Sequence, residues 1–178
     1  SYGLTSIAFL LPATLMNIVT GGNATLVVRE GDPAPGTDGT FPDRNIYAVL
    51  GGGGHVAVRA RVDRQTGIWA GLPGSLELVA LEGGPVPDED PGVTFGTIHD
   101  GLNINADGTL VFNATLSGDG LNNVDGFWAW TPDGDVNLIV RENDFLEVAP
   151  EKILRIQAIT RFGNSVTARP CKTINYRN

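Results

Sequence analysis

The sequence predicts an all-β protein built from about three four-stranded antiparallel sheets. Turn-forming residues are abundant, with 24 Gly and 11 Pro among 178 residues, and several short patterns return along the chain. Charged residues make up only 18% of the chain, while hydrophobic residues reach 42%, which is enough to build a sizeable core. Short apolar runs separated by frequent turns are typical of many short strands and argue against a helical bundle.

Three short patterns recur along the sequence. One is a strand that ends in glutamate: it begins at Leu26 and returns at Leu78 and Leu138, so that the starting leucines are 52 and 60 residues apart. In the first two copies the glutamate leads into a Gly-x-Pro-x-Pro turn. Recurrence at such an interval indicates a repeat architecture. The other two patterns are an aromatic strand, at 67–74 and 126–134, and an Asn-x-x-Gly turn with its strand, at 105–112 and more weakly at 51–58.

The best-preserved copies serve as the model for one unit. An extended segment leads through the turn Asn105–Gly108 into a strand whose apolar residues alternate. We expect a polar loop next, over 117–126, then a short aromatic strand, a Thr-Pro-Asp-Gly turn and a last strand. The proline-rich links that follow two of the glutamates should prevent further pairing and so fix where one unit ends.

This register divides one domain, residues 1–178, into about three units, and we expect the sequence to start and stop inside a repeat. The apolar segment Ile7–Val19 resembles the hydrophobic region of a signal peptide, but the repeats favour a pair of core strands there. Glu151–Arg161 has a possible helical spacing, although its place in the register predicts a strand. No segment reads as a transmembrane helix. The expected units are approximately 1–50, 51–104 and 105–162, with a partial strand and tail at 163–178.

These patterns are similar to those of a known family. The Asn-x-x-Gly-x-x-Val-Phe pattern at 105–112, together with the Gly-Ile-Trp-Ala-Gly and Val-Arg-Glu-Gly-Asp-Pro-Ala-Pro-Gly segments, resembles the repeat of bacterial "choice-of-anchor" tandem-repeat surface proteins, whose signature is Asn-x-x-Gly-x-x-Ala-Phe. The resemblance covers roughly residues 6–168. It implies a secreted or cell-surface location and names no ligand. The chain differs from the family pattern in having few repeats and no hydrophobic anchor in residues 169–178.

A four-stranded sheet cannot bury both of its faces alone, so consecutive units must pack on each other. Radial packing gives a β-propeller, and three units are too few to close a ring of about 4–8 blades. We therefore expect a propeller-like arc that associates with further copies of itself; a stacked β-sheet solenoid is the alternative. The exposed end sheets are the reason to expect self-association.

Charge and cysteine content exclude several classes of partner and site. The formal net charge is −8, and no cluster of Lys and Arg exists to bind phosphates, so we expect no nucleic-acid partner. The only cysteine, Cys171, excludes an internal disulfide framework and a cysteine-rich metal site.

The tryptophans are the first candidate binding residues. Flat aromatic rings on a β scaffold can stack on sugar rings, which makes a surface glycan a possible partner. Trp69 and Trp128 recur at equivalent positions, which favours a place in the core between units; Trp130 has Gly71 as its counterpart and is the better candidate for exposure.

The predicted polar loop is the candidate metal site, since carboxylate and amide oxygens at nearby positions suit Ca²⁺. Its spacing matches no EF-hand, and ordinary turn chemistry also explains these residue types. The four candidate ligands are Asp119, Asn122, Asn123 and Asp125.

Two patterns are compatible with catalysis. His99 and Asp100 are adjacent and could act as a dyad if a serine, such as Ser117 or Ser165, folded against them. Glutamates at 30, 82 and 142 share one register, and we interpret them as strand-end residues that hydrogen-bond the following turn, because a catalytic pair needs no third copy.

The sequence thus predicts a secreted or cell-surface β-repeat module for attachment, assembly or carbohydrate binding. A hydrolase of a glycan or ester, using carboxylates or the His99–Asp100 pair, is the second possibility. The third is a structural subunit of an extracellular polymer, in which Ile7–Val19 docks into the open sheet edge of a neighbour.

Overall fold

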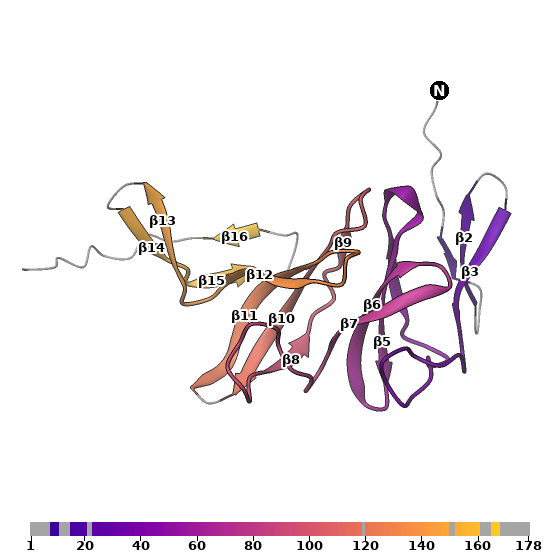
Figure 1. Cartoon of the computed structure of the whole chain (residues 1–178), viewed down its shortest axis with the longest axis horizontal. Coiled ribbons are helices and arrows are strands. Elements are labelled where there is room, and N and C mark those ends of the chain that lie inside the picture. The colour runs from indigo at the N-terminus through magenta and orange to yellow at the C-terminus, as the bar shows by residue number, and fades with distance from the viewer. Residues whose placement is uncertain are drawn as a thin grey trace, which may run out of the picture.

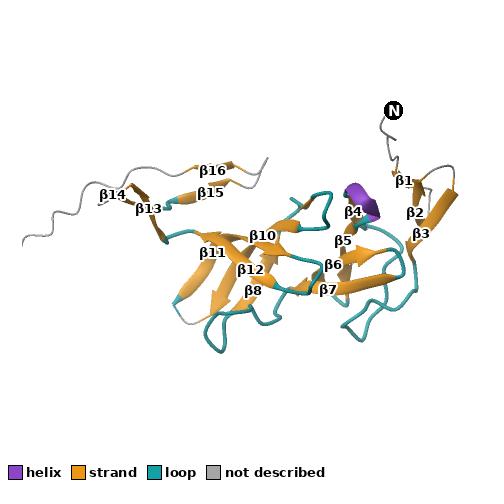
Figure 2. Ribbon diagram, turned by 45° about the horizontal axis from the view of Figure 1, so that its top comes forward, coloured by secondary structure: helices purple, strands orange, loops and turns teal. Residues whose placement is uncertain are grey.

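The computed structural model describes residues 8–10, 15–20, 23–118, 120–149, 152–160 and 165–167. It confirms an all-β protein: its strands form several antiparallel sheets, and one 3₁₀ turn, Gly52–Gly54, is the helical element of the described residues (Figure 2). No helix in these ranges is long and apolar enough to span a membrane.

The strands follow one another along the chain and pair with their sequence neighbours. An N-terminal sheet has the order β1-β2-β3, a middle sheet has the order β4-β5-β6-β7, and a distal sheet has the order β12-β11-β10-β8, with β9 also paired to β10. Two hairpins follow. The bounds are β1 (Ala8–Leu10), β2 (Leu15–Thr20), β3 (Asn23–Arg29), β4 (Tyr47–Leu50), β5 (Val56–Val62), β6 (Gln65–Leu72), β7 (Ser75–Leu81), β8 (Thr94–Ile98), β9 (Asn103–Ile104), β10 (Leu110–Gly118), β11 (Leu121–Trp130), β12 (Val136–Arg141), β13 (Phe145–Ala149), β14 (Lys152–Arg155), β15 (Ala158–Thr160) and β16 (Ser165–Thr167).

Several expected elements are present. The Ile7–Val19 segment contains the antiparallel pair β1 and β2, and the 151–161 segment is extended, as the register predicts, in β14 and β15. The middle sheet starts at Tyr47 and the distal sheet at Thr94, so the first strand of each lies before the unit boundary predicted from sequence.

The predicted polar loop at 117–126 is wrong. Strands β10 and β11 continue through most of it, with Ser117 opposite Asn122 and Gly118 opposite Leu121. A register shift lies between Leu116 and Ser117, where the apolar alternation of β10 stops. The backbone therefore keeps its ladder pairing through most of this segment. Ser117, Gly118 and Asn123 are partly or fully exposed, whereas Leu121 and Val124 pack against the core and Asp125 is buried.

The three sheets stand in a row and pack face to face (Figure 1). One core cluster joins Val27 and Val28 of β3 to the face of the middle sheet that carries Trp69. A second cluster joins the opposite face of the middle sheet, including Ile68 and Ala70, to the face of the distal sheet that carries Trp128. In both contacts, the face of a sheet that carries the tryptophan covers a face of the preceding sheet.

The tryptophan faces share one local arrangement. Trp69 lies edge-on to Phe41, with 5.0 Å between ring centroids, and Trp128 lies edge-on to Phe95 at 5.4 Å. Each tryptophan follows a glycine by two residues, which places both on the same strand face. The six-membered ring of the indole then lies over that glycine: a Cβ added at Gly126 would stand 2.5 Å from Cη2 of Trp128, and one at Gly67 would stand 2.6 Å from Cη2 of Trp69.

Adding a methyl group beneath the indole should destabilise the protein. We expect Gly126→Ala to lower the free energy of unfolding by about 1–3 kcal/mol, because overpacking a filled core forces side chains out of their rotamers. Denaturant unfolding measures the loss. In a Trp128→Leu background the same Gly126→Ala change should cost much less, since the clashing ring is gone. Equal costs in the two backgrounds would show that the ring does not set the requirement for glycine.

Candidate functional site

The three candidate tryptophans are buried. The expectation that Trp130 is exposed is wrong: it lies beside Trp128 on the same face of β11 and belongs to the core between the middle and distal sheets. Its side chain enters the core because β11 runs its alternating residues through that interface. Trp69 donates a hydrogen bond from Nε1 to the Pro35 carbonyl at 2.8 Å, whereas Nε1 of Trp128 is buried without a partner. None of these rings offers a face on which a sugar could stack.

The predicted calcium ligands do not meet as a cluster of carboxylates within the described chain. Asp119 and the side chain of Asn122 lie outside the described residues. Asn123 is exposed and adopts a positive φ of 51°. Asp125 is buried and bonded to a histidine. Over the described ranges, no group of three or more His, Cys, Asp or Glu residues could hold a metal ion. The calcium site remains a prediction.

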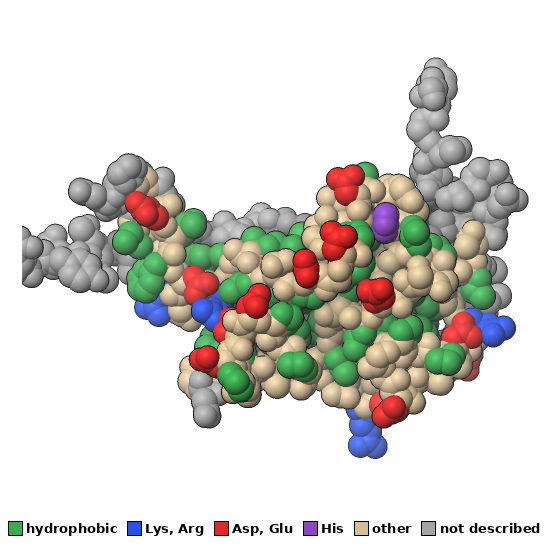
Figure 3. All heavy atoms as spheres, in the orientation of Figure 1, with side chains coloured by type: hydrophobic (Ala, Val, Ile, Leu, Met, Phe, Trp, Pro, Cys, Tyr) green, Lys and Arg blue, Asp and Glu red, His purple; other side chains and the backbone are tan. Residues whose placement is uncertain are grey.

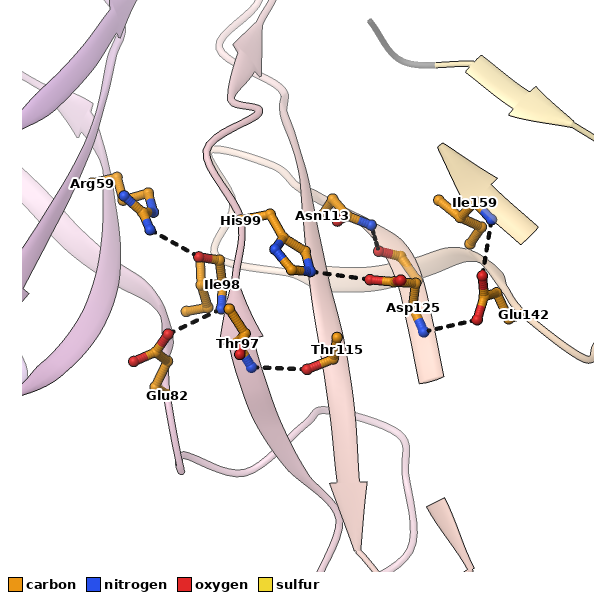
Figure 4. A network of polar contacts seen from close by, with 11 residues as sticks. Arg59, Glu82, Thr97, Ile98, His99, Asn113, Thr115, Asp125, Glu142 and Ile159 are labelled. Carbon is orange, nitrogen blue, oxygen red and sulfur yellow. Dashed lines mark hydrogen bonds and ion pairs between the residues drawn. The ribbon is translucent and has the colours of Figure 1, made fainter. Parts of the chain in front are cut away.

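His99 is paired with Asp125, and the sequence-based pairing with Asp100 is wrong. Nε2 of His99 lies 3.0 Å from Oδ1 of Asp125, and both side chains are largely buried (Figure 4). Asp100 instead points to Arg59, with 2.9 Å between Nη1 and Oδ1. Both residues follow the end of β8, and the chain bends at Asp100, so that the two side chains have different partners.

The histidine pair lies within a buried polar group on β8, β10 and β11. The backbone N–H of His99 donates to the Asn113 carbonyl at 3.0 Å, and the Asn113 side-chain amide donates to the Gly126 carbonyl at 2.7 Å. Thr115 accepts a bond from the backbone N–H of Thr97 at 2.8 Å. A carboxylate so placed can fix the orientation and tautomer of an imidazole. Among the described residues, however, no serine or threonine hydroxyl is hydrogen-bonded to His99.

Two of the recurrent glutamates connect one sheet to the next. One carboxylate oxygen of Glu82 accepts the Thr66 backbone N–H at 2.9 Å, and the other accepts that of Ile98 at 3.2 Å. Glu142 repeats this with the N–H groups of Asp125 at 3.4 Å and Ile159 at 3.0 Å. The expectation that these glutamates bond the following turn is therefore wrong.

The backbone N–H and the backbone carbonyl of Ile98 are both hydrogen-bonded to side chains of the middle sheet (Figure 4). Its N–H donates to Glu82 of the middle sheet, and its carbonyl accepts a bond from Nη2 of Arg59 at 3.0 Å, also from the middle sheet. Glu82 and Arg59 thus fix where β8 ends against the middle sheet.

The backbone repeats the same connection three times. A residue in the left-handed conformation after the last strand donates its N–H to the carbonyl of an apolar residue farther along the chain: Gly31 to Phe41 at 3.0 Å, Gly83 to Phe95 at 2.7 Å and Asn143 to Ile156 at 2.8 Å. The N–H of the same apolar residue donates back, to Asp32, Gly84 or Asp144, at 2.9 Å in all three cases. We call this combination of turn, returning backbone bonds and apolar residue the junction.

Two junctions carry an ion pair inside the turn. Arg29 bonds Asp32 and Arg141 bonds Asp144. Arg141 also reaches Glu89 at 2.7 Å, which ties the preceding link to the end of β12. Burial acts to lower the pKa of Arg141, but its hydrogen bonds and charge interactions with Asp144 and Glu89 outweigh burial, so its pKa is raised and the guanidinium stays charged.

The apolar residues of the junctions were not among those predicted from the sequence. Phe41 and Phe95 each follow a threonine at the end of a proline-rich link, and this Thr-Phe pair was the available signal. The links are themselves paired: Pro33 forms a β-bridge with Thr40, and Pro85 forms one with Thr94. The expectation that proline ends pairing there is wrong, because the hydrogen bonds of each bridge are donated by residues other than the proline: Ala34 and Phe41 in the first link, Val86 and Phe95 in the second.

A family model described as "Family of unknown function (DUF7453)" matches residues 12–169. The chain belongs to this family. No curated protein and no solved structure gives a significant match to the chain.

Removing the negative charge of a bridging glutamate should weaken the protein. Glu82→Gln leaves one acceptor oxygen and turns an NH₂ group toward a backbone N–H, so we expect the free energy of unfolding to fall by about 1.5–3 kcal/mol, the range for hydrogen bonds to charged groups. Denaturant unfolding compares it with Glu142→Gln, which should behave alike, and with Glu77→Gln, an exposed position on β7 that should cost little. Equal losses at Glu77 and Glu82 would contradict the bridging role.

Proposed function

We propose that this chain is a non-catalytic β-repeat module, secreted or held at the surface of a bacterial cell, that acts in attachment and assembly. The observation that carries the proposal is the recurrence of the junction, with the same returning backbone bonds at 31–41, 83–95 and 143–156. A chain whose sheets contact mainly their sequence neighbours behaves as a linear array, which is suited to spacing and presenting surfaces.

The proposal takes the sheets as about three units of a propeller-like arc; a stacked solenoid is the alternative. Two features support repeat units: the glycine–tryptophan–phenylalanine packing occurs in both the middle and distal sheets, and the bridging glutamate occurs at the end of both. In both contacts between sheets, the tryptophan face of the later sheet packs on the earlier one, and either arrangement is compatible with this packing.

One observation supports the location and two narrow the role. The resemblance of residues 6–168 to choice-of-anchor surface proteins favours an extracellular place. The net charge of −8 favours solubility there and disfavours nucleic acid. Burial of Trp69, Trp128 and Trp130 removes the surface on which glycan binding depended, so attachment through protein contacts is the better-supported role.

Cell fractionation tests the location. We expect antibody against the protein to detect it in the cell envelope or the culture medium of the bacterium that produces it, with a cytosolic enzyme as the marker for leakage. Recovery in the cytosolic fraction alone would exclude a secreted module.

A hydrolase is the second candidate because His99 and Asp125 form a largely buried pair at 3.0 Å, the orienting half of a catalytic triad. We expect no turnover of ester or glycoside substrates by the purified protein. If turnover occurs, is lost in His99→Ala and persists in the control Asp100→Asn, whose side chain is directed to Arg59, the hydrolase replaces the non-catalytic module.

A further inference from the structure

One position recurs in the last strand of each of the three sheets. In each sheet a register shift between the last two strands leaves one extra residue on the last strand: Val27 in β3, Val79 in β7 and Ile139 in β12. Val27 and Val79 are only 8% and 7% exposed, whereas Ile139 is 54% exposed. The backbone geometry is the same, so the difference lies in what covers the side chain.

A second position shows the same contrast. This position lies three residues after the left-handed residue of each junction, at the start of the link between sheets. It is occupied by Ala34, Val86 and Leu146. Ala34 is 1% exposed and Val86 is 6% exposed, but Leu146 is 48% exposed. Leu146 lies opposite Leu154 in the β13–β14 hairpin, and Leu154 is partly exposed as well.

In the first two copies, the residues at both positions are covered by the next sheet. Val27 and Ala34 are buried in one cluster with Phe41 and Trp69, on the tryptophan face of the middle sheet. Val79 and Val86 are buried in the other cluster with residues that include Phe95 and Trp128, on the tryptophan face of the distal sheet.

In the third copy, the residues at these two positions, Ile139 and Leu146, are not covered. Ile156 and Ile159 pack against Phe127, Val111 and Val140 on the outer face of the distal sheet. Ile139 and Leu146 are outside this cluster and remain exposed, and Figure 3 shows hydrophobic side chains on the surface of the β13–β14 hairpin. Two exposed apolar residues at positions that are buried elsewhere indicate an interaction surface.

We propose that Ile139, Leu146 and Leu154 form an acceptor face that binds the N-terminal sheet of a second copy of this chain. The inference rests on the assembly role proposed above and specifies its surface. The N-terminal sheet is the matching partner because the described residues of β3 pack by one face, through Val27 and Val28, against the middle sheet. The N-terminal sheet and the β13–β14 hairpin lie at opposite ends of the row of sheets (Figure 1).

Binding of this kind would continue the contact found twice within the chain, in which each sheet covers the apolar face of the sheet before it. The two surfaces in contact differ, so the association is head-to-tail. Head-to-tail contacts close into a ring when the rotation between copies allows it and otherwise extend into a filament.

Light scattering over a concentration series tests the proposal on the full chain. We expect the mass of the wild type to rise with concentration, and we expect Leu146→Asp to raise the dissociation constant at least tenfold, because a carboxylate would be buried in an apolar contact. Ile139→Asp should act in the same way. Both residues are exposed within one chain, so the monomer should keep its circular dichroism spectrum and melting temperature.

The hairpin supplies a matched control. Phe145 is 65% exposed, but it is adjacent to Leu146 on β13 and so points to the opposite face of the hairpin. Phe145→Asp should therefore leave the mass distribution as in the wild type. A loss of association in Phe145→Asp equal to that in Leu146→Asp would overturn the assigned face.

Mixing tests the direction of binding. Leu146→Asp keeps an intact N-terminal sheet, so an excess of this variant should bind the acceptor face of wild-type chains and reduce their mean mass. An unchanged mean mass would overturn the head-to-tail arrangement, and a wild type that stays at one chain at every concentration would overturn the proposal as a whole. These results are independent of cell fractionation, which tests the location alone, so the two proposals can fail separately.

Discussion

The sheets of this protein are small, and the middle and distal sheets each have two apolar faces. Four short strands that are apolar on both sides cannot exclude water unless a second layer lies on each side, so the fold depends on the contact between consecutive sheets. The residues that the sequence repeats most clearly serve that contact. Trp69 and Trp128 with their phenylalanine partners fill it, and Glu82 and Glu142 fix its alignment through backbone N–H groups.

The two glutamate bridges are linked through the distal sheet. Glu82 bonds the N–H of Ile98, the next residue is His99, and His99 bonds Asp125. The backbone N–H of Asp125 donates to Glu142, which in turn accepts the N–H of Ile159. This series of polar contacts runs from the middle sheet, through the distal sheet, to the β15–β16 hairpin. Because buried hydrogen-bonded groups are costly to separate, His99 and Asp125 have a structural role whether or not the protein is catalytic.

The sequence was sufficient to predict the strands but not the partner of each side chain. Turn residues and alternation located the hairpin at Asn105–Gly108, and the repeats showed that 151–161 is extended, because both are local properties. Whether Trp130 is buried depends on the middle sheet, which is distant in sequence. The composition of 117–126 predicts a loop because Gly, Asn and Asp outnumber its apolar residues, although most of its backbone is paired.

The candidate site was predictable only in part for the same reason. Adjacency in sequence suggested His99 with Asp100, but the partner of His99 is Asp125 on β11, and Asp100 lies in the bend after β8 with its side chain at Arg59. Register correctly indicated that the glutamates at 82 and 142 share one structural task. It could not show that the acceptor of each bond belongs to one sheet and a donor to the next, since that requires knowledge of how the sheets stack.

The links between sheets are closed at their base by the same backbone hydrogen bonds, yet their contents differ. Residues 33–40 and 85–94 are proline-containing turns with one β-bridge each, whereas the third link contains the paired strands β13 and β14. The entropy of closing a loop changes slowly with its length once its ends are fixed. The links are therefore the places where this scaffold can accommodate inserted or exchanged peptides, so that new surface can be gained there without rebuilding the stacked sheets.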